Sequence, residues 1–182
     1  ASINIGQREL ILGNAREARM HLQQGLESLS SISATYLRTN PKSAGIVSCN
    51  AGAAFSWGPF KASSVADCGD RRSQTESDQY LSGLYRDQAV AALKLAEATE
   101  SEQRSDLLRQ IALSSAAVSI WSSGEASQTA LSYTYLGDAL RGLDRTAEAG
   151  PAYATAYGLG LRANWVSTNW SELYRFPLVK KV

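Results

Sequence analysis

The clearest hydrophobic pattern in the sequence runs from Tyr133 to Ala156. Apolar residues recur there at steps of three and four, the spacing that places them on one face of a helix. The period breaks near Asp144 and resumes near Thr146, which predicts two helices joined by a tight turn. Small residues alternate with large ones along this face, so the two helices are expected to approach closely. The small positions are Gly137, Ala149 and Ala156, and the large ones are Tyr133, Leu136, Leu140 and Tyr153.

The same order of small and large positions recurs at the start of the chain. When Gly6 is placed on Gly137, Gly13 falls on Asp144. The same register aligns Ala18 with Ala149, Leu22 with Tyr153 and Gly25 with Ala156. Residues 1–38 are therefore predicted to form a helical hairpin equivalent to that of residues 125–160. Asn14 is expected to cap the second helix of this first hairpin, with Glu17 as its capping-box partner.

Residues 78–122 are predicted to form another hairpin, in which the repeat pattern is weaker. Asp78 and Ser105 are the expected caps of its two helices, and residues 99–104 form a polar turn between them. Three hairpins and no strand pattern make the expected fold all-α. In the last hairpin, Pro151 requires the second helix to start close to Glu148 or to be kinked there. Gly158 and Gly160 are expected to end that helix.

This arrangement of large and small sites resembles the tetratricopeptide repeat, a helical hairpin of about 34 residues. The resemblance implies a short α-solenoid, in which the first helix of each hairpin lines a concave face that holds a partner segment. It places Thr134, Asp138 and Arg141 on this face in the third hairpin, and Gln7 and Leu10 in the first. The alternative for Asp138 and Arg141 is an ordinary surface ion pair three residues apart.

Two stretches depart from the repeat pattern. Residues 39–77 are rich in Gly, Ser, Pro and Asn and also hold Cys49 and Cys68, which predicts an irregular loop insertion. The two cysteines form either a disulfide that closes this loop or a pair of reduced thiols. Residues 161–182 are rich in aromatic side chains and are predicted to cap the last repeat. The alternative is an arm that docks on a neighbouring subunit.

Composition and candidate chemistry narrow the function further. A net charge of +1 over 182 residues argues against nucleic acid as the main partner. No apolar stretch reaches the roughly 20 residues that span a bilayer. The single histidine, His21, has no neighbouring catalytic motif, so no metal site, cofactor or enzymatic activity is predicted. The chain begins at Ala1 rather than Met, and together with the cysteine pair this favours an exported protein, periplasmic or extracellular.

Three function classes follow from these observations. The first is a non-enzymatic scaffold or adaptor that grips a protein or peptide partner on its concave face. The second is a structural subunit of an exported or cell-envelope assembly, which uses the loop and the C-terminal segment as contacts. The third is an enzyme built on helices, which would need convergent polar groups in a closed pocket.

Overall fold

A computed structural model describes residues 1–41, 43 and 78–162, and the structural statements below concern these residues. Helices make up nearly all of this part of the chain and it contains no strand, which confirms the all-α prediction for the described residues. The helices are α1 (Ser2–Ile11), α2 (Ala15–Thr39), α5 (Gln79–Glu97), α6 (Glu102–Ser122), α7 (Ala126–Gly142) and α8 (Thr146–Arg162).

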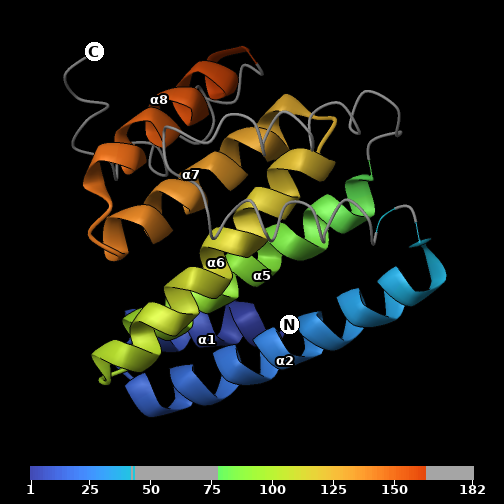
Figure 1. Cartoon of the computed structure of the whole chain (residues 1–182). Helices are drawn as coiled ribbons and strands as arrows, with labels where there is room; N and C mark the ends of the chain where they lie inside the picture. Colours follow the sequence, from blue (N-terminus) through green and yellow to red (C-terminus); the bar gives the residue numbers. More distant parts are fainter. Residues whose placement is uncertain (42, 44–77, 163–182) are drawn as a thin grey trace.

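The helices pack in the order in which they follow along the chain. Each contacts the next, from α1 on α2 to α7 on α8, and α5 also contacts α7. Figure 1 shows α1 and α2 at one end of the described structure and α7 and α8 at the other, with α5 and α6 between them. The contacts are therefore mostly local, and α5 and α6 connect the two outer hairpins.

The interior consists of two apolar clusters that meet at Leu26. The larger one joins α5, α6, α7 and α8 around Leu113, Ile120 and Leu136. The smaller one joins α2 to α5 and α6 through Leu22, Leu95 and Leu108. Both clusters contain many alanines, and small side chains let neighbouring helix axes come close together. Leu26 contacts both clusters, so α2 is packed against the same interior as the last hairpin.

The two outer hairpins share the close contact that the sequence alignment predicts. A Cβ atom built on Gly6 would lie 2.6 Å from Cγ of Leu22, and one built on Gly137 would overlap the ring of Tyr153. The internal alignment places Gly6 on Gly137 and Leu22 on Tyr153, so the two contacts occupy equivalent positions. Because both glycines are buried against a large side chain of the following helix, the predicted packing of bulky residues on glycine is confirmed.

The turns of these two hairpins are also equivalent. Gly13 has φ 80° and Asp144 has φ 58°, so the aligned residues both adopt the left-handed conformation. In the first turn, N–H of Asn14 donates to the Glu9 carbonyl at 2.9 Å. In the second, N–H of Arg145 donates to the Leu140 carbonyl at the same distance. This pairing of a left-handed residue with a bond back across six residues is the Schellman arrangement that ends many helices.

Three local predictions at helix starts have different outcomes. Asp78 caps α5 as expected, since its Oδ1 accepts N–H of Leu81 at 3.0 Å. The prediction that Ser105 caps α6 is wrong, because Ser101 takes that role and accepts N–H of Arg104 at 3.4 Å. Ser105 is buried one turn later and donates to the Ala96 carbonyl at 3.1 Å. Asn14 occupies the cap position of α2 without a side-chain cap bond.

The last helix, α8, begins where the periodicity resumes but ends later than expected. It starts at Thr146, so Pro151 lies inside the helix, and it continues through Gly158 and Gly160 to Arg162. The expected stop at these glycines is therefore wrong. Packing explains this result: Ala149, Tyr153 and Ala156 are buried, and burial of one helix face outweighs weak local propensity.

Some predictions concern residues outside the described part of the chain. The proposed bond between Cys49 and Cys68 lies there, as do most of the loop insertion of residues 39–77 and the C-terminal cap or arm beyond Arg162. The first hairpin extends one residue further than expected, since α2 ends at Thr39.

Substitutions in the two equivalent turns should have opposite effects on stability. Asp144→Gly should raise the free energy of unfolding by about 0.5–1 kcal/mol, because glycine adopts the left-handed conformation without steric cost. Gly13→Ala should lower it by about 1 kcal/mol. No atom lies within 4 Å of a Cβ built on Gly13, so the loss would come from the backbone alone. Urea unfolding of the two variants measures both changes in the free energy of unfolding. Changes of the same sign would contradict the equivalence of the two turns.

Candidate functional site

A cluster of polar groups lies where α7 meets α8. The hydroxyl of Tyr153 donates to Oδ1 of Asp138 at 3.1 Å. The guanidinium of Arg141 lies 3.6 Å from the same Oδ1. Asp138 therefore bridges a buried tyrosine on α8 and an arginine whose side chain is about half exposed. The predicted pair of Asp138 and Arg141 thus has a third member that the sequence analysis did not identify.

The environment of Tyr153 changes its acid–base behaviour. Burial raises the pKa of its hydroxyl well above the ordinary value, and the negative charge of Asp138 raises it further. The positive charge of Arg141 partly offsets this rise in the pKa. The phenol is therefore held protonated as a hydrogen-bond donor over the whole physiological range and cannot act as a base there.

The structure separates the other predicted partner-binding residues. Thr134 is 3% exposed, and its hydroxyl donates to the Ala130 carbonyl at 3.1 Å, so it offers no polar group at the surface. Leu10 is partly buried against the smaller apolar cluster, and Gln7 is partly exposed next to Gly6. Both belong to α1, whereas Asp138 and Arg141 belong to α7 at the other end of the described structure (Figure 1).

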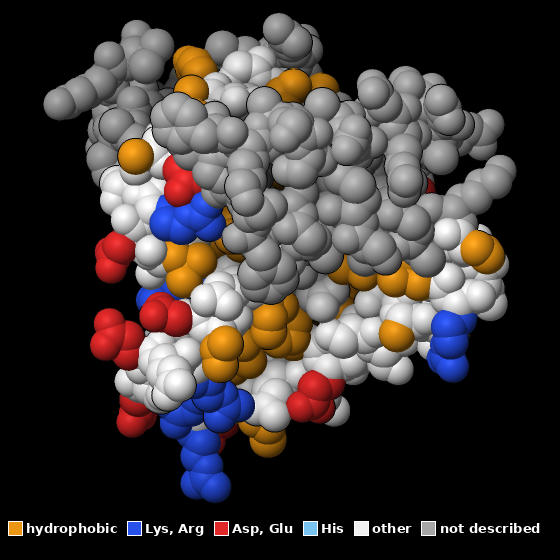
Figure 2. Space-filling model, in the orientation of Figure 1, with side chains coloured by type: hydrophobic (Ala, Val, Ile, Leu, Met, Phe, Trp, Pro, Cys, Tyr) orange, Lys and Arg blue, Asp and Glu red, His pale blue; other side chains and the backbone are white. Residues whose placement is uncertain are grey.

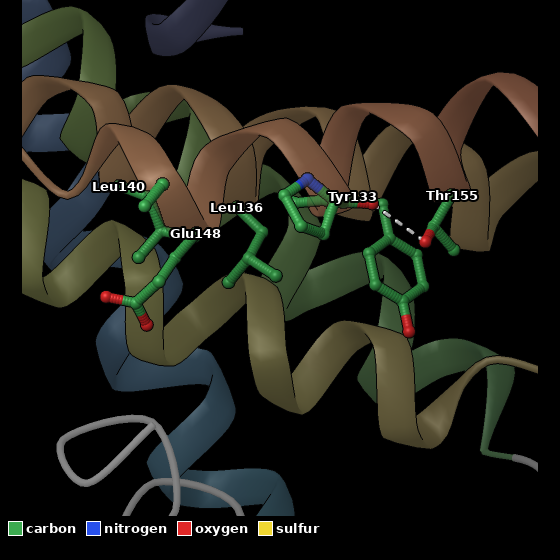
Figure 3. A pocket seen from close by; sticks show the side chains of 8 residues that line it. Tyr133, Leu136, Leu140, Glu148 and Thr155 are labelled. Atoms are coloured by element: carbon green, nitrogen blue, oxygen red, sulfur yellow. Dashed lines mark hydrogen bonds between the residues drawn. The ribbon is translucent and has the colours of Figure 1, made fainter. Parts of the chain in front are cut away.

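A groove of about 280 Å³ lies between α7 and α8. Its lining residues are Tyr133, Leu136, Leu140, Ala147, Glu148, Pro151, Ala152 and Thr155. Figure 3 shows Glu148 towards the Leu140 end of the groove and Thr155 towards the Tyr133 end. By helix periodicity the groove residues of α7 lie on a different side of that helix from Asp138 and Arg141. The sequence pattern does not predict this groove, because its lining comes from two helices whose packing the periodicity does not specify.

The polar side chains that line the groove form hydrogen bonds with residues three or four positions away in the sequence. Glu148 accepts both bonds of a forked pair from Arg145, at 2.7 Å from Nε and 2.6 Å from Nη2. Thr155 donates its hydroxyl to the Pro151 carbonyl at 2.9 Å. Proline has no N–H, so the carbonyl of Ala147 lacks the donor that an α-helix normally supplies four residues later.

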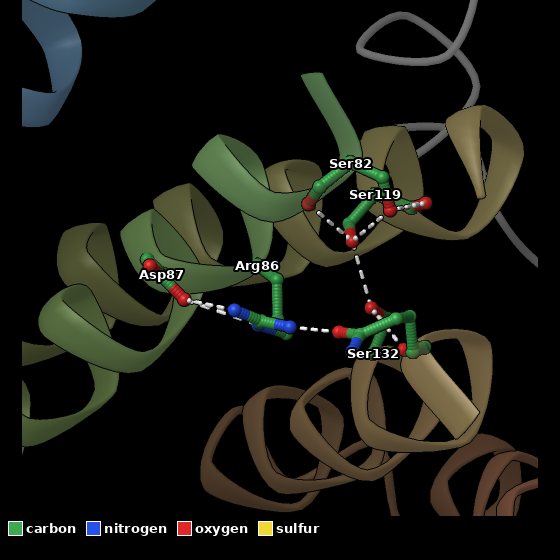
Figure 4. Close-up of polar contacts among 6 residues, drawn as sticks. Ser82, Arg86, Asp87, Ser119 and Ser132 are labelled. Atoms are coloured by element: carbon green, nitrogen blue, oxygen red, sulfur yellow. Dashed lines mark hydrogen bonds and ion pairs between the residues drawn. The ribbon is translucent and has the colours of Figure 1, made fainter. Parts of the chain in front are cut away.

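A second set of polar groups is buried between α5, α6 and α7 (Figure 4). Ser82 and Ser119 donate to each other's backbone carbonyls, at 2.9 Å and 2.8 Å. The hydroxyl of Ser132 lies 2.7 Å from that of Ser119. All three serines are less than 4% exposed, so these bonds help to fix the relative position of three helices.

A smaller pocket of about 220 Å³ opens beside these serines. It is lined by Gln79, Ser82, Gly83, Arg86, Ser123, Glu125 and Gln128. The guanidinium of Arg86 donates to Oδ1 of Asp87 and to Oε1 of Gln128. Arg86 is paired with Asp87, and Glu125 adds a negative charge to the lining, so this pocket has no net positive charge with which to bind an anion.

The described residues contain no group of three or more His, Cys, Asp or Glu side chains that could hold a metal ion. His21 lies partly exposed on α2. On the face drawn in Figure 2, basic and acidic side chains are interspersed over the described residues. None of the described helices combines the length and the hydrophobicity needed to cross a membrane.

Comparison with known proteins gives no relative for this chain. No family model, no curated protein and no solved structure matches it. The function must therefore be inferred from the residues and contacts described above.

The raised pKa of Tyr153 predicts a loss of stability at alkaline pH. The folded state keeps this phenol protonated above the unfolded pKa of about 10, so its stabilising effect is complete below that pH and decreases as the pH rises. Tyr153→Phe should therefore flatten the alkaline decrease in unfolding free energy. Urea titrations between neutral pH and pH 11 test this, and an unchanged alkaline slope would contradict the assignment.

Proposed function

We propose that this protein is a non-enzymatic binding module, a short tetratricopeptide-like solenoid that grips a segment of a partner protein. The observation that carries this proposal is the equivalence of the α1–α2 and α7–α8 hairpins. They share a buried glycine against a large side chain, the same left-handed turn and the same bond across it. Repeated hairpins of this kind stack into extended surfaces that bind other chains.

The exposed side of α7 near Arg141 is the proposed contact surface. Asp138 is fixed by Tyr153, and Arg141 extends beyond it with its side chain about half exposed. A charged side chain anchored on a rigid helix can recognise an opposite charge at little entropic cost. Gln7 and Leu10 occupy the equivalent positions of α1 in the internal register and form a second proposed contact.

The alternative is a structural subunit of an exported or cell-envelope assembly. One observation favours it: apolar side chains are exposed at the turn between α1 and α2 and in the second turn of α2. Ile11 is 87% exposed and Leu12 is 59% exposed, as is Met20. Large apolar side chains gathered at one edge of a protein often mark a contact with another subunit. The exported location is part of this proposal.

Reversing one charge should separate binding from folding. Arg141→Glu should weaken capture of a partner protein by about tenfold, because a charge that attracts the partner becomes one that repels it. The melting temperature should change little, since an exposed ion pair contributes less than about 1 kcal/mol. The matched control is Arg16→Glu, which reverses an exposed charge on α2. Quantitative capture from extracts of the native source, with thermal unfolding of each variant, provides the measurement.

The same samples distinguish the two functions. A scaffold should be monomeric by light scattering and should lose its partner only in Arg141→Glu. A subunit should self-associate and should dissociate on Leu12→Asp with Ile11→Asp. Equal capture by the wild type and by both arginine variants would contradict the proposed contact surface.

A further inference from the structure

Two parts of the chain, the first ending at Ser43 and the second beginning at Asp78, pack against each other along α2 and α5. Near the start of α2 this contact is apolar, because Leu22 shares the smaller cluster with Leu95. Leu26 extends the contact to the larger cluster. The first part is therefore anchored on the interior of the second by side chains alone.

Towards the end of α2 the contact with α5 becomes polar. The amide of Gln88 donates to the hydroxyl of Ser30 at 3.1 Å. Three residues further along α2, the hydroxyl of Ser33 interacts with the phenol of Tyr85. A step of three residues forwards on α2 is thus matched by a step of three residues backwards on α5. The two helices therefore run antiparallel and stay in contact towards the last turn of α2.

One carboxylate joins the end of the first part to the start of the second (Figure 1). Oδ2 of Asp78 accepts the hydroxyl of Tyr36 at 2.8 Å and that of Ser43 at 2.7 Å. Its Oδ1 caps α5 by accepting N–H of Leu81. The ring of Tyr36 also packs on that of Tyr80, with the ring centroids 5.0 Å apart. These contacts are called the Asp78 clasp below.

We propose that these two parts form one folding unit that holds together without the covalent connection through residues 44–77. The apolar clusters supply the attraction between the two parts, and the Asp78 clasp fixes where the chain leaves α2 and enters α5. Because side chains of the helical body hold both ends of the connection, its length has little effect on the free energy of folding. This inference goes beyond the proposed binding function and does not depend on it.

The connection joins the helical body far from the proposed contact surface at Arg141. The smaller pocket is lined by both Gln79 and Glu125, which places the start of α5 beside the start of α7. Arg141 lies sixteen residues beyond Glu125, which is about 24 Å along a helix axis. Cutting the connection should therefore leave the contact surface unchanged.

Side-chain variants of the full chain test the clasp. Tyr36→Phe should raise the equilibrium constant for unfolding about fivefold, because one hydroxyl that bonds to Asp78 is lost. Asp78→Asn keeps an acceptor for N–H of Leu81 but puts an amide donor in place of Oδ2, so the rise should be about tenfold. The double variant should add little to Asp78→Asn. The matched control is Tyr80→Phe, which removes the hydroxyl of the other ring and should leave the constant unchanged in urea unfolding.

A cut within the connection tests the folding unit itself. A protease recognition sequence is inserted between Gly58 and Pro59 of the full chain, and the folded protein is cut in the presence of a reducing agent, which keeps Cys49 and Cys68 unlinked. The two fragments should stay together, with the mass of the uncut protein in light scattering and the same circular dichroism. The melting temperature of the cut protein should fall on dilution, because unfolding now separates two chains.

The clasp should also govern the affinity of the two fragments for each other. In the cut protein, Asp78→Asn should raise the dissociation constant about tenfold, whereas Tyr80→Phe should leave it unchanged. The proposal is overturned if the fragments separate or lose helicity, if the uncut protein with the insertion fails to fold, or if the folded protein resists the protease. Each of these results would show that the helical body needs the connection. Additive effects of Tyr36→Phe and Asp78→Asn would show that the clasp does not join the two parts, and they would overturn the proposal as well.

Discussion

The close contact between Gly137 and Tyr153 is the constraint on which the last hairpin depends. With no Cβ on Gly137, the aromatic ring lies directly against the backbone of α7, and this sets the separation of α7 and α8. The same ring places its hydroxyl on Asp138, so one side chain fixes the helix spacing and anchors a polar group near the surface. In the first hairpin, Leu22 packs against Gly6, and a leucine side chain carries no polar group that could reach the surface. The two hairpins therefore share a scaffold, and only the last one links its packing to a charged surface.

The internal serines complement this packing. Alanine-rich helices can slide past one another at little cost, because their surfaces have few protruding side chains. The bonds among Ser82, Ser119 and Ser132 remove this freedom, since a shift of one helix would leave buried hydroxyl groups unpaired. Polar contacts thus contribute to the register of the central helices beside apolar ones such as Leu113 and Ile120, and glycine sets the spacing of the outer hairpins.

The sequence predicts the helical fold and the glycine contacts because periodicity and residue size act locally. The equivalence of Gly6 with Gly137 and of Leu22 with Tyr153 could be found for that reason. Thr134 could not be placed, because burial depends on neighbouring helices and a threonine can return its hydroxyl to its own backbone. The groove could not be predicted because it depends on how α7 and α8 pack side by side, and packing of Ala149 and Tyr153 keeps Pro151 in the interior of α8. The third member of the polar cluster, Tyr153, was assigned to packing alone since its hydroxyl partner lies on another helix.

The most direct test of this account compares one added methyl group at two glycines. Gly137→Ala should lower the free energy of unfolding by about 1–3 kcal/mol, because the methyl group would collide with the ring of Tyr153. Gly83→Ala should raise it by up to about 1 kcal/mol, since no atom lies within 4 Å of a Cβ built there and alanine favours the helix. Urea unfolding of the two variants gives both values. Equal changes, or a Gly137→Ala protein as stable as the wild type, would contradict the claim that this contact sets the structure.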